Sequence, residues 1–237
     1  MLESGIRTDF WEWEMSNIGR RRASALLQDA ETYTKRRREI VEVAAQLFKR
    51  NGYARTSLND VAEELASDRA TIYYYFANKK ELLHEVVRDV VVQTAKDATV
   101  IRKSNDPPPV KLRKLIVALM GSYAANFPYQ YVYIQEGLAV KSHGDGHLFK
   151  LGQQYERCLV DIIAEGLADG SFRSESDPKV IAFGILGSLN WTHRWFNPAG
   201  RLTSDQVAES FAELFLRGLA PQGKKASATK LANARSA

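Results

Sequence analysis

The segment from Thr56 to Glu81, TSLNDVAEELASDRATIYYYFANKKE, constrains the fold more than any other part of the chain. Leu58, Val61 and Leu65 recur at helical spacing, and this pattern predicts a short helix with one buried face. Ser57 followed three residues later by Asp60 resembles a capping box at the start of that helix. A polar break at residues 66–68 follows, which predicts a tight turn.

A second short helix is predicted after the turn, with Ser67 or Asp68 as its N-cap. Ile72 and Phe76 fall on its inner face, so the side chains between them project outward. Asn78 then caps a third helix. Two short helices around a tight turn are typical of a helix-turn-helix, which presents its second helix to the major groove of DNA.

The run DVAEELASDRATIYYYFANKKELL strongly resembles the DNA-binding signature of the TetR family of bacterial transcriptional repressors. The resemblance extends upstream through residues 37–56. The turn departs from the family's usual Gly-Val-Ser, because it reads Ala66-Ser67-Asp68 here. Ala66 implies either a turn without left-handed backbone or one that accepts a cost of about 1 kcal/mol.

The resemblance implies a set of DNA contacts around the second helix. Tyr73 and Lys79 are expected to touch phosphates. The residues expected to face the groove or to lie beside it are Arg69, Ala70, Thr71, Tyr74 and Tyr75, and those expected to meet the DNA backbone or nearby bases are Thr56, Ser57 and Asn59. The alternative for the three tyrosines is a partly buried position in the core. A single helix-turn-helix buries too little surface for tight binding, so a homodimer on a palindromic operator is expected.

Composition sets wider bounds on the chain. Its 237 residues allow one large domain, or a small domain and a larger one, and the net charge of +5 permits a polyanionic partner. The single cysteine, Cys158, excludes an intramolecular disulfide and suits a reducing cytoplasm. No apolar run approaches the roughly 18 residues needed to span a bilayer, so no membrane segment is predicted. No cofactor motif is evident.

The whole chain is predicted to be all-α, with about nine helices. The expected order is a mobile N-terminal extension (residues 1–33), a DNA-binding domain (34–80), a helical effector-binding and dimerisation domain (81–220) and a disordered basic tail (221–237). The first firm helix is expected to begin at Lys35, and the helix that begins near Pro178 is expected to continue to Asn197.

The last two predicted helices are candidates for the dimer interface. They offer a strip of small residues and an apolar face, and their members are Gly184, Gly187, Ser188, Phe211, Leu214 and Phe215. Small residues allow close approach of helices, and the TetR family uses the corresponding helices for a four-helix dimer interface. The alternative is that these residues pack only within one chain.

Aromatic residues in the middle and late helices are candidates for an effector site, although such residues belong more often to a core. The candidates are Tyr123, Phe127, Tyr133, Trp191, Arg194 and Trp195. The segment from Asn190 to Leu202 resembles family members that respond to acyl-CoA thioesters, and this implies an apolar or acyl-CoA-like effector. Arg194 is then the candidate partner of its anionic part.

Two other classes of function remain open. His143, Asp145 and His147 alternate in a way that could bind a metal in an enzyme, but the glycines between them favour a plain loop. A helical interaction module without specific DNA binding is the second alternative. The preferred prediction is a cytoplasmic, non-enzymatic repressor that a small molecule releases from double-stranded DNA.

Overall fold

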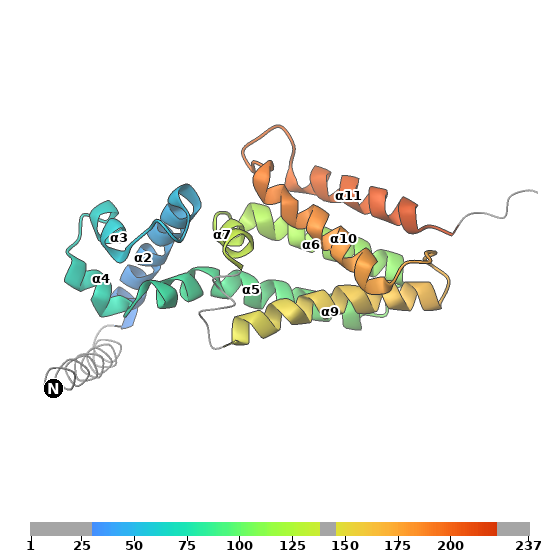
Figure 1. Cartoon of the computed structure of the whole chain (residues 1–237), viewed down its shortest axis with the longest axis horizontal. Helices are drawn as coiled ribbons and strands as arrows, with labels where there is room; N and C mark the ends of the chain where they lie inside the picture. Colours follow the sequence, from blue (N-terminus) through green and yellow to red (C-terminus); the bar gives the residue numbers. More distant parts are fainter. Residues whose placement is uncertain (1–29, 138–145, 222–237) are drawn as a thin grey trace, which may run out of the picture. The chain divides into compact units, whose positions relative to one another are not determined.

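The computed structural model describes residues 30–137 and 146–221, and this part of the chain is all-helical, as predicted. It holds nine α-helices, one 3-10 helix and no strand (Figure 1). The elements are α2 (Ala30–Asn51), α3 (Leu58–Glu64), α4 (Arg69–Tyr75), α5 (Lys79–Lys103), α6 (Pro108–Ala125), α7 (Tyr129–Gln135), α9 (His147–Ala168), α10 (Pro178–Asn190), η1 (Trp191–Arg194) and α11 (Ser204–Leu219). His143, Asp145, the predicted tail beyond residue 221 and most of the predicted extension lie outside the described residues.

The chain forms two compact units. The first takes in the described residues up to Gln93 and those of the range 125–152, and the second takes in residues 94–124 and the described residues from Gln153 to 221. Both α5 and α9 contribute to both units. The predicted boundary between the DNA-binding domain and the effector-binding domain, at residues 80–81, falls near the start of α5. It differs from the division into compact units and remains a prediction.

The core of the first unit forms around the helical faces that the sequence predicts. Ile40 and Phe48 of α2 and Ile72 of α4 are fully buried, together with the paired residues Leu82 and Leu83 of α5. Helix α3 packs against both α2 and α4, and α7 packs against α2. Because helices of seven residues are unstable in isolation, α3 and α4 depend on this packing.

Local capping groups determine where the short helices begin. Ser57 and Asp60 form the predicted capping box on α3, and the carboxylate of Asp68 accepts a hydrogen bond from the backbone nitrogen of Thr71 at 2.6 Å. This hydrogen bond holds the pKa of Asp68 below its usual value. Ala66 adopts a φ of +47°, so the turn does take up left-handed backbone at the cost expected for a residue with a Cβ atom.

Two helix limits differ from those predicted. Helix α2 already includes Ala30, the first described residue and five residues before Lys35, and Tyr33 in this part of the helix is buried. Helix α10 ends at Asn190, and η1 replaces its predicted continuation. There the hydroxyl of Thr192 donates to the carbonyl of Leu189 at 2.6 Å, which favours the tighter 3-10 turn.

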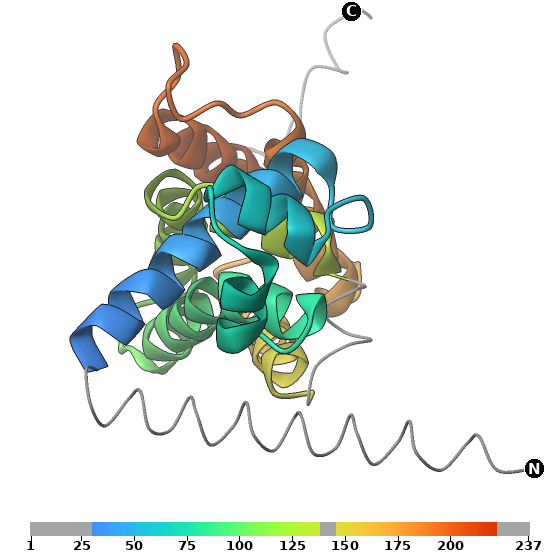
Figure 2. The same cartoon turned by 90° about the vertical axis from the view of Figure 1, so that its left-hand side faces the viewer.

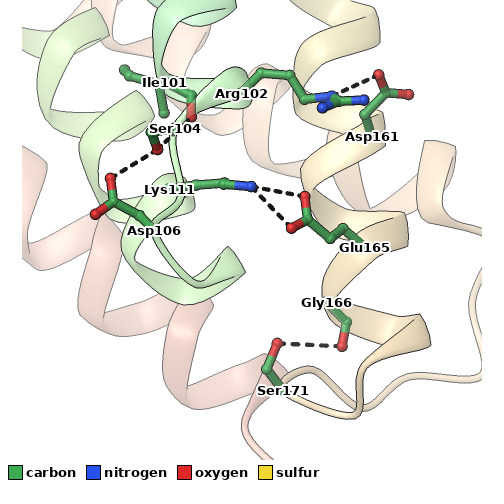
Figure 3. Close-up of polar contacts among 9 residues, drawn as sticks. All are labelled: Ile101, Arg102, Ser104, Asp106, Lys111, Asp161, Glu165, Gly166 and Ser171. Carbon is green, nitrogen blue, oxygen red and sulfur yellow. Dashed lines mark hydrogen bonds and ion pairs between the residues drawn. The ribbon is translucent and has the colours of Figure 1, made fainter.

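Ion pairs join helices within the second unit. The ammonium of Lys111 on α6 reaches both carboxylate oxygens of Glu165 on α9, at 2.9 and 3.0 Å (Figure 3). Arg102 near the end of α5 pairs with Asp161 on α9 at 3.0 Å. No helix within the described residues is long and apolar enough to cross a membrane.

Candidate functional site

Helix α4 has one face of exposed and half-buried side chains, and it can be followed after α2 and α3 in Figure 2. Arg69 and Ala70 are exposed, and Thr71, Tyr73 and Tyr74 are half-buried. The guanidinium of Arg69 lies 5.0 Å from the ring centroid of Tyr73 and donates to its hydroxyl at 3.1 Å. Two of the predicted DNA-contacting side chains therefore form a pair on the outer face of the helix.

Tyr75 lies differently from the prediction. It is only 9% exposed, and its ring centroid lies 4.9 Å from that of Tyr33 and 5.1 Å from that of Tyr74. Tyr33 belongs to the early turns of α2 that the sequence patterns do not predict, so this partner was missed. Tyr33 of α2 therefore packs against α4 through the buried ring of Tyr75, and Tyr75 has a packing role instead of a groove-facing one.

Thr56 is also buried, at 1% exposure, so its side chain does not lie on the outer surface that the predicted DNA contact requires. Its hydroxyl donates to the carbonyl of Gly52 at 2.9 Å and thereby closes the turn after α2. Ser57 and Asn59, at the start of α3, are exposed as expected. The hydroxyl of Ser57 already accepts the capping hydrogen bond from the backbone of Asp60.

Lys79 is held within the chain, although the family resemblance implies a phosphate contact. Its ammonium donates to the carbonyls of Thr56 at 2.7 Å, Tyr53 at 2.8 Å and Ala54 at 3.3 Å. The same ammonium lies 4.4 Å from the ring centroid of Tyr53. A lysine ammonium has three donors, so Lys79 links the start of α5 to the loop that precedes α3.

Replacing Lys79 with methionine is expected to lower the free energy of unfolding by about 1–2 kcal/mol, because three carbonyls lose a charged donor. Urea denaturation at fixed protein concentration measures this change. Lys80→Met is the matched control, since Lys80 is exposed and loses the same charge. Equal stability of the two variants would contradict the supporting role of Lys79.

An ion pair joins α2 to α5 close to the end of α4. The guanidinium of Arg37 lies 2.5 Å from the carboxylate of Glu85 and 4.7 Å from the ring centroid of Phe76. Burial alone raises the pKa of Glu85, but the hydrogen bond and charge of Arg37, with Arg88 nearby, bring it below its usual value. Glu85 therefore stays ionised at neutral pH and keeps Arg37 in place.

The predicted dimerisation residues lie on α10 and α11 of the second unit. Gly184, Gly187 and Leu214 are exposed, and the rings of Phe211 and Phe215 stack at 6.0 Å. A Cβ atom added to either glycine would meet nothing within 4 Å in the described structure, so packing within one chain does not require glycine there. Ser188 is half-buried, and its hydroxyl donates to the carbonyl of Gly184 at 2.8 Å.

A groove runs between these two helices, with a volume of about 200 Å³. Its lining is almost wholly apolar and consists of Ile181, Gly184, Ile185, Leu214, Phe215, Gly218 and Leu219. Val180 and Phe183 add exposed apolar surface on α10. The result is an apolar face with an open groove, which is the kind of surface that marks a protein–protein contact.

The predicted effector residues are divided between the two units. Phe127 and Tyr133 belong to the first unit, where the ammonium of Lys49 lies 4.3 Å from the ring centroid of Phe127. Tyr123 is buried in the second unit. Trp191 and Trp195 are exposed, and the guanidinium of Arg194 lies 5.6 Å from the ring centroid of Trp191. Four of the six residues therefore belong to the second unit, where Tyr123 is buried and Trp191, Arg194 and Trp195 are exposed.

The core of the second unit contains a polar residue that the sequence reasoning did not select. Tyr155 of α9 is buried, and its hydroxyl has no hydrogen-bond partner in the described structure. Its place on the helical stripe of α9 was visible in the sequence, but a lone tyrosine on such a stripe gives no sign of an unpaired hydroxyl. The hydroxyl of Tyr123 on α6, in contrast, donates to the carbonyl of Asn190 at 3.4 Å.

The described residues include only one of the three candidate metal ligands, His147. His147 is exposed, whereas His143 and Asp145 lie outside the described part of the chain. No group of three potential ligands is found among the residues that are described. Burial raises the pKa of the Cys158 thiol, which suits a core residue better than a nucleophile.

Comparison with known proteins places these features in a family. The family model described as "Bacterial regulatory proteins, tetR family" matches residues 40–86, and "Tetracyclin repressor-like, C-terminal domain" matches residues 105–219. The TetR family regulator PfmR from Thermus thermophilus is 30% identical in sequence, with a TM-score of 0.68 over 77% of this chain and 99% of PfmR. The chain belongs to the TetR family.

Two other proteins are similar to this chain over most of their length. The HTH-type transcriptional repressor KstR2 of Mycolicibacterium smegmatis is 26% identical over 193 residues, which cover 80% of this chain and 94% of KstR2. AibR, solved in complex with isovaleryl coenzyme A and operator DNA, is 25% identical, with a TM-score of 0.66 over 76% of this chain and 97% of AibR. The family assignment therefore covers both the helix-turn-helix and the helices that follow it.

Proposed function

We propose that this TetR protein is a homodimeric transcriptional repressor that binds a palindromic operator and leaves it when a small molecule binds. The observation that carries the proposal is the outer face of α4, where Arg69 and Tyr73 form a pair above a helix supported by buried tyrosines. The helix-turn-helix places such a face in the major groove, where arginine side chains can read base edges. The proposal assigns no catalytic role to any residue, and it places the protein with its DNA in the cytoplasm.

Arg69 is the residue with which to test the DNA interface. Arg69→Ala is expected to weaken specific operator binding by about tenfold or more, as for the loss of one good base contact. Gel-shift titration on genomically selected DNA, repeated over a range of salt concentrations, measures the effect. The selection first establishes whether discrete specific complexes form at all.

Lys96→Ala provides the control for this experiment. Lys96 is an exposed cation on α5, outside the helix-turn-helix, so its loss changes the net charge equally. If the two variants bound the operator alike, α4 would have no special part in reading DNA. If the wild-type protein formed no specific complex, the interaction-module alternative would replace the repressor.

The remaining residues proposed to contact DNA are those whose side chains are exposed or half-buried. Thr71, Tyr73 and Tyr74 are the candidates on α4, with Ala70 beside them, and Ser57 and Asn59 are those at the start of α3. Thr56, Tyr75 and Lys79 act instead by shaping the support of these two helices.

An apolar or acyl-CoA-like effector is the proposed ligand class. AibR, a relative of similar fold, is known in complex with isovaleryl coenzyme A, and this supports the class without identifying the compound. Arg194 is exposed and remains the candidate partner for the anionic part of the effector. Competition of acyl-CoA thioesters against a bound operator fragment tests the class directly.

Effector release requires a difference in affinity between two conformations of the protein. A ligand that binds both conformations equally shifts nothing, and a tenfold change in operator affinity requires about 1.4 kcal/mol of coupling. Helix α5 is the candidate element for this coupling, because its residues belong to both units. The operator DNA and the effector then both change the balance between the two conformations of α5.

A further inference from the structure

The hydroxyl group of Tyr155 is the one buried side-chain polar atom without a hydrogen-bond partner in the described residues. Tyr155 lies near the middle of α9, and Tyr123 of α6 and Cys158 of α9 are close enough to influence its ionisation. Leaving a buried hydroxyl unpaired is unfavourable, because the group has lost its hydrogen bonds to water. A native protein that keeps such a group calls for an explanation, and one explanation is a ligand that supplies the partner.

The hydroxyl and amide groups nearby in the same unit already have acceptors of their own. The amide nitrogen of Gln154 donates to the hydroxyl of Thr99 at 2.8 Å, and Thr99 donates to the carbonyl of Ala95 at 2.8 Å. The hydroxyl of Tyr123 donates to the carbonyl of Asn190. Pairing is therefore the rule in this core, and Tyr155 is the exception.

The surroundings of Tyr155 favour an uncharged acceptor. Burial raises the pKa values of the Tyr155 and Tyr123 hydroxyls and of the Cys158 thiol, so all three groups are neutral at neutral pH. The charges that act on Cys158 are Asp161 and Arg102, which pair with each other, and Arg157. The groups that act on the Tyr155 hydroxyl itself are Cys158 and Tyr123, both neutral, so a carboxylate or phosphate brought there would lose its hydration without meeting a charged partner, which is strongly unfavourable.

We propose that Tyr155 donates a hydrogen bond to the thioester carbonyl oxygen of a bound acyl-CoA, with the acyl chain among the apolar side chains of α6 and α9. This proposal rests on the proposed effector class and specifies which part of the effector enters the core. Leu119 and Met120 of α6 and Leu159 of α9 are buried and supply apolar surroundings in the same unit. The charged part of coenzyme A stays outside this core.

A double-mutant cycle between protein and ligand tests the proposal. A panel of isovaleryl-, octanoyl- and palmitoyl-CoA is first titrated calorimetrically against the DNA-free wild-type protein, and the tightest ligand is chosen. Its S-alkyl thioether analogue, in which a methylene replaces the carbonyl, is then titrated against wild type and Tyr155→Phe. Wild type is expected to prefer the thioester about five- to tenfold, and the preference is expected to fall to about one in the variant.

Tyr123→Phe is the matched control, because it removes a buried phenol hydroxyl that already has an acceptor in the chain. It is expected to keep the preference for the thioester. Tyr155→Phe is expected to melt at the wild-type temperature or above it, because it removes an unpaired polar group. A clearly lower melting temperature would show that the hydroxyl of Tyr155 already has a partner in the free protein, which contradicts the proposal.

Three further outcomes would overturn the proposal: no binding of any acyl-CoA in the panel, no preference of wild type for the thioester, or an unchanged preference in Tyr155→Phe. Operator binding is measured on the same protein preparations. It distinguishes a failure of the Tyr155 proposal from a failure of the proposed repressor function. A protein that binds its operator specifically but ignores the carbonyl is still a repressor, and only the role of Tyr155 is lost.

Discussion

Replacing Glu165 with alanine is expected to lower the free energy of unfolding by about 3 kcal/mol, whereas Lys111→Met is expected to cost less than about 1 kcal/mol. The two residues form one ion pair, but their surroundings differ (Figure 3). The Lys111 side chain is only 6% exposed, whereas that of Glu165 is 41% exposed. Removing Glu165 therefore leaves a buried ammonium unpaired, but removing Lys111 leaves a carboxylate that water can reach.

Equilibrium urea denaturation at one fixed protein concentration compares these variants, because the apparent stability of an oligomer depends on concentration. The double variant Lys111→Met with Glu165→Leu is the control, and it is expected to restore most of the stability, since neither charge remains. A cost for Lys111→Met equal to that for Glu165→Ala would show that the exposure of the two partners does not govern the pair.

Helix starts could be predicted from the sequence because caps are local. Ser57 and Asp60, and likewise Thr203 and Gln206, form the capping boxes that their spacing predicts. The helical pattern of apolar residues likewise predicted the buried side chains of α2 and α5. Both kinds of signal depend on residues within one or two turns of each other, so one sequence is sufficient to find them.

The roles of individual site residues depend on partners far along the chain. Tyr75 is buried because Tyr33 lies against it, and Lys79 is held by carbonyls more than twenty residues away. Neither partner has a signal in the pattern around α4. The aromatic residues first assigned to one effector site were likewise grouped by type, but the fold buries Tyr123 and exposes Trp191.

Leu214→Glu is expected to weaken dimerisation at least about 100-fold, because it places a carboxylate on the apolar face that the proposed dimer buries. Leu214 lines the groove between α10 and α11 and is 63% exposed in the single chain. Operator affinity is expected to fall by about 100-fold or more as well. Two helix-turn-helix domains that are no longer joined in a dimer bind their half-sites separately. Light scattering after size exclusion measures the first effect, and gel-shift titration the second.

Val100→Glu is the matched control for this prediction. Val100 is 62% exposed on α5, and its replacement likewise puts a carboxylate in place of an exposed apolar side chain, but on another helix. It is expected to leave both the dimer and the operator complex close to wild type. An intact dimer in Leu214→Glu would place the interface elsewhere. A monomer that kept full operator affinity would remove the reason for expecting a palindrome, because one helix-turn-helix would then be sufficient for tight binding.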